Sequence, residues 1–368
     1  EAVRKMYVED MPLTVVLDTK GGNLYEEGKE EYLKSIGHDV YVINYRPDYL
    51  LYPYRLFFPE RIKCSGLKGS LYVFLRELLS IPIRFKRRIK FRRFCRQRLS
   101  IINLDLQSED NDFDLFILGS DQIWNRDITE DDSVFWGDAR AFQCKKLITY
   151  AASAGSVRVL SEINKSDIRD RLSDFYSISV REKSLSTYLL ENIGIESQVV
   201  LDPVLLAGRN VFEQISCKIN VNKPYLLFFA LEGNDDAVAF AEYQASAMGL
   251  ELIIMFSMKE ALKDRRVKQT LSPDEFISYF QQASFVITTS FHGMAFSILF
   301  EKEFVFYSSG VAQSERMCNL LSELGLSERI YSTGEKFRKF DKIDYTSVEQ
   351  KLEKNRMASI DYLASNLS

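Results

Sequence analysis

The sequence predicts an α/β protein of two doubly wound, Rossmann-like domains that face a cleft. Its 368 residues and apolar content of 46% suit roughly two domains with large cores. Short apolar runs rich in β-branched and aromatic residues alternate with helical segments through both halves, which is typical of parallel sheets covered by helices. Several of these runs end in small polar residues, as strands do at the ligand-binding edge of such sheets.

The N-terminal part of the chain opens with an expected βαβ unit. Residues 13–17 and 39–43 are predicted strands, and residues 25–36 are the predicted helix between them, which implies a parallel sheet. The predicted N-terminal domain covers residues 1–206 and contains a basic helical insertion at about residues 50–110. A linker at residues 207–223 leads to the predicted C-terminal domain at residues 224–345, and a final helix follows at residues 346–368.

A strongly basic segment lies inside the predicted insertion. Residues 84–98 contain nine Lys or Arg residues and no acid, interleaved with Phe85, Ile89, Phe91 and Phe94. A helix of this pattern is amphipathic and basic, which favours contact with an anionic membrane surface. The alternative is a solvated helix that pairs with acids elsewhere in the chain.

Polar residues follow the next predicted strands. Residues 113–118 form a buried strand that delivers Gly119, Ser120, Asp121 and Gln122 at its carboxyl end. Small and polar groups at this position suit ligand binding, although Asp121 could instead cap the following helix.

Two further strands of this half also end in charged residues. Residues 176–180 lead to Arg181, which either meets a ligand or pairs with Glu182. Residues 199–201 close the domain, and Asp202 and Pro203 are expected to leave it as extended chain.

The C-terminal half contains the segment most indicative of a site. Residues 285–289 are a predicted strand and residues 294–300 a predicted helix, with Ser290, His292 and Gly293 between them. His292 is one of two histidines in the chain, and histidine is the side chain that titrates nearest neutral pH. The segment therefore predicts either a proton donor or acceptor, or a polar helix cap.

Charge and cysteine content exclude other classes. A net charge of −4 argues against a general nucleic-acid binder. The five cysteines are scattered without a C-x-x-C pair, which predicts free thiols in a reducing compartment and neither disulfides nor zinc. No apolar run reaches the length of a membrane span and no signal-peptide pattern opens the chain, so we expect a cytoplasmic protein.

Several sequence blocks together resemble the polysaccharide pyruvyl transferase family. They are GSDQIWN at residues 119–125, ITYAASAGS at 148–156, SVREKS at 179–184, VLDPVLL at 200–206, SFHGMAFSILF at 290–300 and Arg316 in a late helix. The blocks cover residues 112 to 330, and weaker similarity at GHDVYVINYRPDYL reaches back to residue 37. The resemblance implies a fold similar to that of GT-B glycosyltransferases.

The resemblance also implies an activity. A pyruvyl group would pass from phosphoenolpyruvate to two hydroxyls of a sugar, forming a cyclic ketal, without a metal or organic cofactor. The acceptor could be carried on undecaprenyl diphosphate, with the enzyme at the inner face of the cell membrane. The resemblance implies that His292 is the proton donor and that Arg181 and Arg316 bind the anion of the donor. Asp121 with Gln122 would position the sugar hydroxyl, and Gly119 with Ser120 would form a small-residue wall. Gly293 would lie at a helix N-terminus that holds phosphate.

Two departures from the family pattern are visible. The region after the first strand reads DTKGGNLYEEGKEEYL, where relatives carry a loop rich in asparagine, tyrosine and glycine, so the role of residues 18–28 is open. Ser290 stands where some branches carry an anion-binding arginine.

Two other function classes remain open from the sequence. The first is a GT-B glycosyltransferase that uses a nucleotide sugar, for which Glu232 and Phe256 would have to bind the nucleoside. The second is an inactive sugar-binding subunit, against which the intact SFHG block argues.

Overall fold

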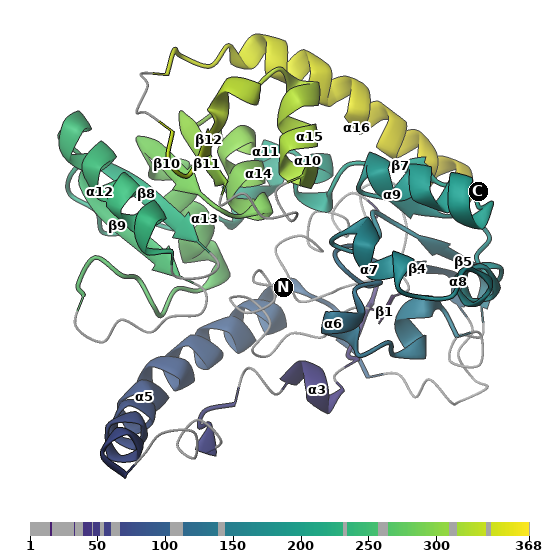
Figure 1. The fold of residues 1–368 in the computed structure, drawn as a ribbon, viewed down its shortest axis with the longest axis horizontal. Coiled ribbons are helices and arrows are strands. Elements are labelled where there is room, and N and C mark those ends of the chain that lie inside the picture. The colour runs from purple at the N-terminus through teal and green to yellow at the C-terminus, as the bar shows by residue number, and fades with distance from the viewer. Residues whose placement is uncertain are drawn as a thin grey trace.

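The computed structural model is a mixed α/β protein with parallel sheets (Figure 1), consistent with a Rossmann-like or GT-B type fold. We refer to residues up to 206 as the N-terminal half and to later residues as the C-terminal half. The structure describes residues 15–16, 33, 40–45, 47–51, 55–59, 67–103, 113–138, 144–230, 234–256, 264–308, 315–335 and 340–367. Residues 18–28, predicted as an atypical loop, lie outside these ranges.

The C-terminal half contains a five-stranded sheet in the order β12-β11-β10-β8-β9, with every neighbouring pair parallel. Its strands are β8 (Tyr225–Ala230), β9 (Glu251–Phe256), β10 (Phe285–Thr288), β11 (Phe304–Ser308) and β12 (Ile330–Ser332). Strand β8 is buried throughout, and its alternate residues Leu227 and Leu226 face two different cores. A strand covered on both faces requires a continuous apolar run, which explains the sequence of β8.

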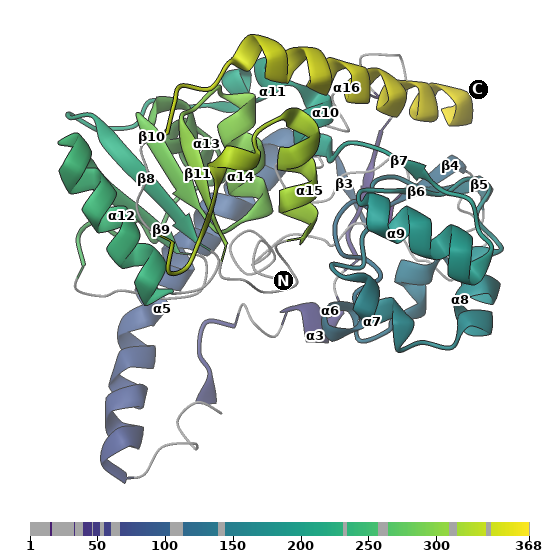
Figure 2. The ribbon, with the colours of Figure 1, turned by 45° about the horizontal axis from the view of Figure 1, so that its top comes forward.

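Helices cover both faces of this sheet (Figure 2). They are α12 (Asp235–Met248), α13 (Pro273–Gln282), α14 (Phe291–Leu299) and α15 (Glu315–Leu324). Helix α12 lies on one face, and α13 and α14 lie on the other. A capping box opens α13, with Ser272 and Glu275 bonding reciprocally.

The N-terminal half is built on a smaller set of strands. Strands β4 (Phe113–Leu118) and β5 (Cys144–Thr149) are parallel, and isolated bridges join β5 and the residues after it to the region of β6 (Ser179–Val180), which pairs with β7 (Gln198–Val199). The remaining pair is β2 (Val42–Ile43) with β3 (Ile101–Ile102).

The first strand differs from the expected parallel βαβ unit. Strand β1 (Val15–Val16) pairs antiparallel with β4, through Val15 opposite Leu118 and Val16 opposite Ile117. An apolar, β-branched run indicates a buried strand but carries no information about its direction. Of the predicted helix at residues 25–36, the structure describes Leu33 alone.

Short helices complete this half. They are α3 (Asp48–Leu51), α6 (Arg126–Thr129), a 3₁₀ turn (Ser133–Trp136), α7 (Val157–Ser161), α8 (Lys165–Leu172), α9 (Lys183–Tyr188), a π-helical turn (Leu189–Ile193) and α10 (Pro203–Ala207). The expected extended exit at Asp202 and Pro203 is wrong, because Asp202 caps α10 and Pro203 occupies its first turn. Helix α11 (Arg209–Ile215) lies within the residues predicted as a linker and buries Phe212.

The C-terminal helix α16 (Tyr345–Leu367) contacts both halves (Figure 1). Leu352 near its start belongs to the core of the C-terminal half, and Leu363 near its end belongs to the core of the N-terminal half. The Tyr362 hydroxyl donates to the Thr149 carbonyl over 2.8 Å. The helix therefore ties the two halves together.

Helix α5 (Leu67–Arg98) contains the basic segment predicted from the sequence. Two of its interleaved aromatic residues, Phe91 and Phe94, are not on an exposed apolar face but are buried in the core of the C-terminal half. Arg84 is also buried, in an ion pair with Glu77. The spacing of the cations predicted the helix correctly but could not show which face the rest of the chain covers.

Candidate functional site

Polar side chains from four strand ends come together between the two halves. Asp121 follows β4, Arg181 follows β6, Asp202 follows β7, and His292 lies in the first turn of α14 after β10. The carboxyl edge of parallel strands is the usual ligand edge of an α/β sheet. Three of these four residues, Asp121, Arg181 and His292, follow strands that the sequence predicts, and the structure adds Asp202.

Arg181 lies at the centre of this cluster. Its guanidinium contacts the carboxylates of Asp202 (Nη1 to Oδ2, 3.0 Å), Glu182 (Nε to Oε1, 3.2 Å) and Asp121 (Nη2 to Oδ1, 3.4 Å). The side chain is 4% exposed, and its charged plane lies 4.8 Å from the centre of the Phe291 ring. Burial works against the charged form, but Glu182, Asp121 and Asp202 together raise the pKa of Arg181.

The backbone around Arg181 is fixed by buried hydroxyls. Thr149 donates to the Ser179 carbonyl over 2.8 Å, and the Ser179 hydroxyl donates to the Thr149 carbonyl over 2.8 Å. Ser153, which is fully buried, donates to Glu182 Oε1 over 2.7 Å and accepts from the Gly155 amide. These bonds hold Arg181 and Glu182 in one orientation at the end of β6.

Asp202 connects Arg181 to the histidine. Its Oδ1 accepts from the Val204 amide over 3.0 Å as the cap of α10, while its Oδ2 accepts from Arg181. The His292 Nε2 lies 3.8 Å from the same Oδ2. Burial raises the pKa of Asp202, but His292, Arg181 and the Val204 amide outweigh it, so the pKa of Asp202 is below its usual value.

His292 is almost fully buried, with 2% of its side chain exposed. Helix α14 begins at Phe291, three residues earlier than predicted, so His292 lies inside its first turn rather than in a loop. Burial lowers the pKa of His292 and outweighs the opposite effects of Asp202 and Asp121. The imidazole is therefore neutral at neutral pH and must gain a proton before it can act as an acid.

The loop after β4 has a constrained backbone. Gly119 has φ +115°, and a Cβ at this position would lie 2.4 Å from the Tyr150 carbonyl oxygen. Asp121 has φ +71°, a left-handed conformation that is uncommon for residues other than glycine and often occurs at functional sites. Its side chain is 22% exposed, whereas Ser120 is buried.

The predicted residue Gln122 supports this loop. Its Oε1 accepts from the Asn125 side-chain amide over 2.8 Å. A Cβ on Gly155 would lie 2.1 Å from the same oxygen, so the Gln122 side chain packs directly on Gly155. These contacts hold the loop after β4 against the loop after β5.

Ser290 and Gly293 shape the start of α14. Ser290 occupies the N-cap position of α14 and is fully buried, and its Oγ has no hydrogen-bond partner among the described residues. A Cβ on Gly293 would lie 2.1 Å from Thr288 Oγ1, so only glycine fits between α14 and β10. Arg316 lies in α15, and its side chain is outside the part of the chain that the structure describes.

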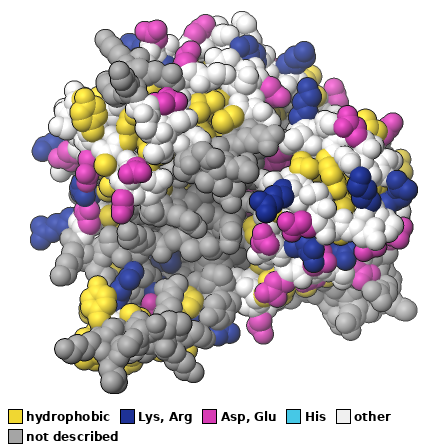
Figure 3. Space-filling model, viewed as in Figure 1, with side chains coloured by type: hydrophobic (Ala, Val, Ile, Leu, Met, Phe, Trp, Pro, Cys, Tyr) yellow, Lys and Arg dark blue, Asp and Glu magenta, His cyan; other side chains and the backbone are white. Residues whose placement is uncertain are grey.

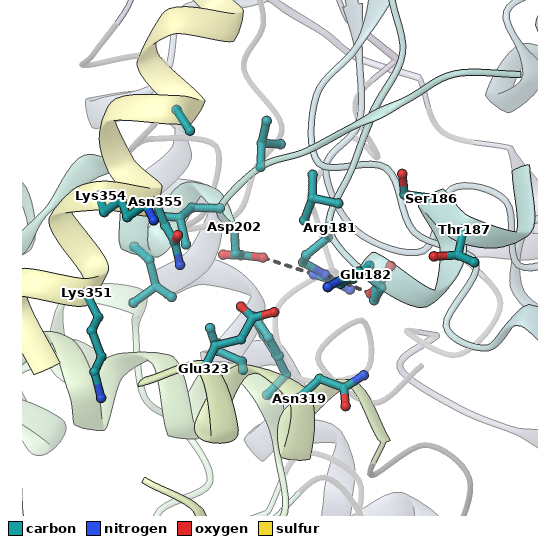
Figure 4. Close-up of a pocket in the computed structure, with 18 of the residues that line it drawn as sticks. Arg181, Glu182, Ser186, Thr187, Asp202, Asn319, Glu323, Lys351, Lys354 and Asn355 are labelled. Atoms are coloured by element: carbon teal, nitrogen blue, oxygen red, sulfur yellow. Dashed lines mark hydrogen bonds and ion pairs between the residues drawn. The ribbon is translucent and has the colours of Figure 1, made fainter. Parts of the chain in front are cut away.

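A pocket of about 660 Å³ opens beside the cluster (Figure 4). Arg181, Asp202 and Phe291 form part of its wall, together with residues of α9, α15 and α16. Three lysines line it, namely Lys183, Lys351 and Lys354. His292 and Asp121 are not among the described lining residues.

A comparison with sequence models of known families identifies the family of the chain. The sequence model of the family described as polysaccharide pyruvyl transferase matches residues 21–310, which is most of the chain. The chain belongs to this family. No curated protein matches it closely enough to count as a relative. A polysaccharide pyruvyl transferase is a transferase enzyme, and the clustered strand ends described above all lie within the matched residues.

Asp202 and Glu182 are residues of the candidate site that the sequence patterns did not indicate. The Asp202–Pro203 pair is a common combination of helix cap and first-turn proline, although a residue before proline also favours extended chain. Glu182 was considered as an alternative partner of Arg181 and not as part of the site.

Among the residues that the structure describes, no three His, Cys, Asp or Glu side chains form a group that could hold a metal ion. No helix in the described ranges combines the length and apolarity needed to cross a membrane. The described cysteines Cys95, Cys217 and Cys318 are not in disulfide bonds.

Proposed function

We propose that this enzyme transfers the pyruvyl group of phosphoenolpyruvate to two hydroxyls of a sugar, forming a cyclic ketal and releasing phosphate. The observation that carries the proposal is the buried His292 beside Asp202 and Arg181 at the strand ends of both halves. The family supplies the pyruvyl transfer and the polysaccharide context. The proposal adds the donor, the ketal product and the roles of the residues.

The reaction needs an acid because the enol carbon of phosphoenolpyruvate must first be protonated. A proton added to its CH₂ carbon makes a methyl group and leaves C2 electrophilic. One sugar hydroxyl then forms a C–O bond to C2 and loses its proton, and the second hydroxyl displaces phosphate by breaking the C2–O bond. One of the two hydroxyl protons replaces the proton that was delivered to carbon, and the other protonates the departing phosphate.

We assign the first proton to His292. Its pKa is lowered by burial, so it begins neutral. A phosphate dianion bound near the first turn of α14 would raise the pKa and favour protonation. Donor binding would in this way prepare the acid for the step in which it is used.

The donor anion is proposed to bind where positive groups meet the start of α14. Arg181 and Arg316 are the candidate arginines, and Ser290 and Gly293 lie at the helix N-terminus, which favours anions. Arg181 already contacts three carboxylates, so a donor would share it with them. Donor affinity should therefore depend on Arg181 keeping its planar shape as well as its charge.

The acceptor hydroxyl is proposed to meet Asp121. This carboxylate is the most exposed of the three around Arg181, with 22% of its side chain accessible against 9% for Glu182 and 1% for Asp202. Gly119 and Ser120 would form the wall beside the sugar, and Gln122 would hold the loop. We propose that the two halves face one another across the adjoining pocket, as the domains of GT-B enzymes do.

A hexose of a lipid-linked polysaccharide repeat unit, carried on undecaprenyl diphosphate, is the proposed acceptor, which would make the enzyme part of capsule or exopolysaccharide synthesis in the cytoplasm. The test is to incubate the protein with phosphoenolpyruvate and a panel of galactosides and N-acetylhexosamines. Phosphate release that depends on the sugar, with a ketal product seen by mass spectrometry, is expected. Binding and turnover of a nucleotide sugar in place of phosphoenolpyruvate would contradict the proposal.

A further inference from the structure

A stripe of large apolar side chains is exposed along the first part of helix α5. Their exposed fractions run from 39% for Phe74 to 68% for Tyr72. The members are Leu71, Tyr72, Phe74, Leu75, Leu78, Leu79, Phe85 and Ile89. Most lie three or four positions apart and therefore share one side of the helix. At 1.5 Å per residue the stripe is about 27 Å long.

The opposite side of α5 is already covered by the chain. Arg84 donates to Glu77 over 2.7 Å and to the Leu56 carbonyl over 3.0 Å, and its guanidinium lies 4.9 Å from the centre of the Phe58 ring. Near the end of the helix, Lys90 contacts Glu275 over 2.5 Å. The helix therefore has a packed inner side, and the exposed stripe is a second, separate apolar surface.

Basic side chains extend the exposed stripe toward the C-terminal end of α5. Lys86, Arg93 and Arg96 are exposed and follow the stripe at helical spacing. Glu77 is the single acid in α5, and it is buried in its pair with Arg84. The exposed side of α5 is thus apolar and cationic on a chain whose net charge is −4.

The position of α5 leaves this side accessible. Its first part projects away from the rest of the protein in Figure 2. In the space-filling view, apolar and basic side chains appear together on this projection (Figure 3).

We propose that this side of α5, residues 71–96, docks the protein on the surface of an anionic phospholipid bilayer. The apolar side chains would enter the headgroup region, and Lys86, Arg93 and Arg96 would pair with lipid phosphates. An anionic bilayer offers an apolar interior beneath negatively charged headgroups, over a surface long enough for the whole stripe. No exposed acid of α5 would repel those headgroups. The proposal does not depend on the catalytic function.

Co-sedimentation of the full chain with vesicles tests this proposal. We expect binding to phosphatidylglycerol–phosphatidylcholine vesicles and little binding to phosphatidylcholine alone, with binding weakened by salt. Each cation near the membrane surface raises the partition coefficient onto the vesicles about fivefold. The triple variant Lys86→Gln, Arg93→Gln, Arg96→Gln should therefore bind about 100-fold less well. The variant Leu75→Gln, Leu79→Gln should also lose binding, because it removes inserted apolar surface.

A matched control removes the same number of exposed cations elsewhere. Arg158→Gln, Lys218→Gln, Arg265→Gln should leave vesicle binding close to that of the wild type. Negligible binding of the wild type to both vesicle types would overturn the proposal, as would an equal loss in the control variant. A dimer in sedimentation velocity that Leu75→Gln, Leu79→Gln disrupts, without vesicle binding, would assign the surface to a second copy instead.

Discussion

Arg181 and Arg329 are both buried, one in each half, but they are balanced differently. Arg329 pairs mainly with Glu303 over 2.9 Å, and that carboxylate is 32% exposed. It also donates to the Asp341 carbonyl and lies near Phe340. Arg181 faces three carboxylates, and the closest of them, Asp202, is 1% exposed.

The difference separates a structural ion pair from a site. The Arg329 and Glu303 charges balance, and water can reach both the Glu303 carboxylate and the more distant Glu328, which lies 3.7 Å from Arg329 and is 59% exposed. The group formed by Arg181, Asp121, Glu182 and Asp202 carries excess negative charge in a buried place, next to a neutral histidine. Such an arrangement is costly for folding alone, which is why perturbed, crowded titratable groups indicate function.

Replacing the two arginines should show this difference most strongly. Arg181→Met would leave buried carboxylates without their cation and should lower the free energy of unfolding by about 3–5 kcal/mol. Arg329→Met should lower it less, because the Glu303 carboxylate can be solvated. Urea unfolding of both variants measures the effect. A loss for Arg329→Met equal to or above that of Arg181→Met would contradict the comparison.

Substitution in the loop after β4, which holds Asp121 next to Arg181, should lower the free energy of unfolding almost as much. Gly119→Ala places a Cβ 2.4 Å from the Tyr150 carbonyl oxygen. Gly208 also has a positive φ, but a Cβ there meets nothing within 4 Å, so Gly208→Ala measures the cost of conformation alone. Because overpacking typically costs about 1–3 kcal/mol, Gly119→Ala should be the less stable variant by that amount. Equal unfolding midpoints would show that the loop moves freely.

The neutral state of His292 predicts a pH effect on stability. Its pKa in the folded protein is below the value of about 6.5 for a free histidine, so the unfolded chain binds the proton first as pH falls. Stability is therefore fully present above pH of about 6.5 and is lost below it, by at most about 1.4 kcal/mol per pH unit. Asp202 acts in the same direction at lower pH, because its folded pKa is also lowered.

Unfolding of the wild type and of His292→Gln at several pH values isolates this effect. The wild type should lose more stability than the variant between neutral pH and pH of about 5, since glutamine does not titrate. Parallel curves would mean that the buried histidine has an ordinary pKa.

The smallest stability effect is expected for Asp121→Asn. Its carboxylate is the most exposed and the most distant from Arg181, at 3.4 Å, so the loss should stay within about 1 kcal/mol. Turnover should fall much further than stability if Asp121 meets the sugar hydroxyl. A variant with normal turnover would remove Asp121 from the proposed chemistry.

Sequence patterns predicted the longer buried strands most accurately. Strand β4 has the predicted bounds, residues 113–118, and β10 ends one residue before the predicted residue 289, because both are largely apolar runs that the fold buries. The very short strands were harder to predict. Strand β12 was missed, and the direction of β1 was wrong, since a two- or three-residue pairing depends on distant partners rather than on local spacing.

The site was partly visible in the sequence. His292, Arg181 and Asp121 could be selected because each follows a predicted strand. Their contacts could not, because Asp202 reaches Arg181 and His292 only after β6 pairs with β7 and α10 packs against α14. The burial of Phe91 in α5 was hidden for the same reason, as the residues that cover it come from α13 and its neighbours.

Turnover of His292→Gln tests the central proposal most directly. The variant and the wild type are given phosphoenolpyruvate and the sugar acceptor, and phosphate release is followed beside the thermal melting point and donor affinity. Glutamine keeps the polarity and approximate size, so the variant should fold and bind donor with modest change, while its rate falls by about 10²- to 10⁴-fold. A folded variant that releases phosphate at a rate near that of the wild type would show that His292 is not the acid.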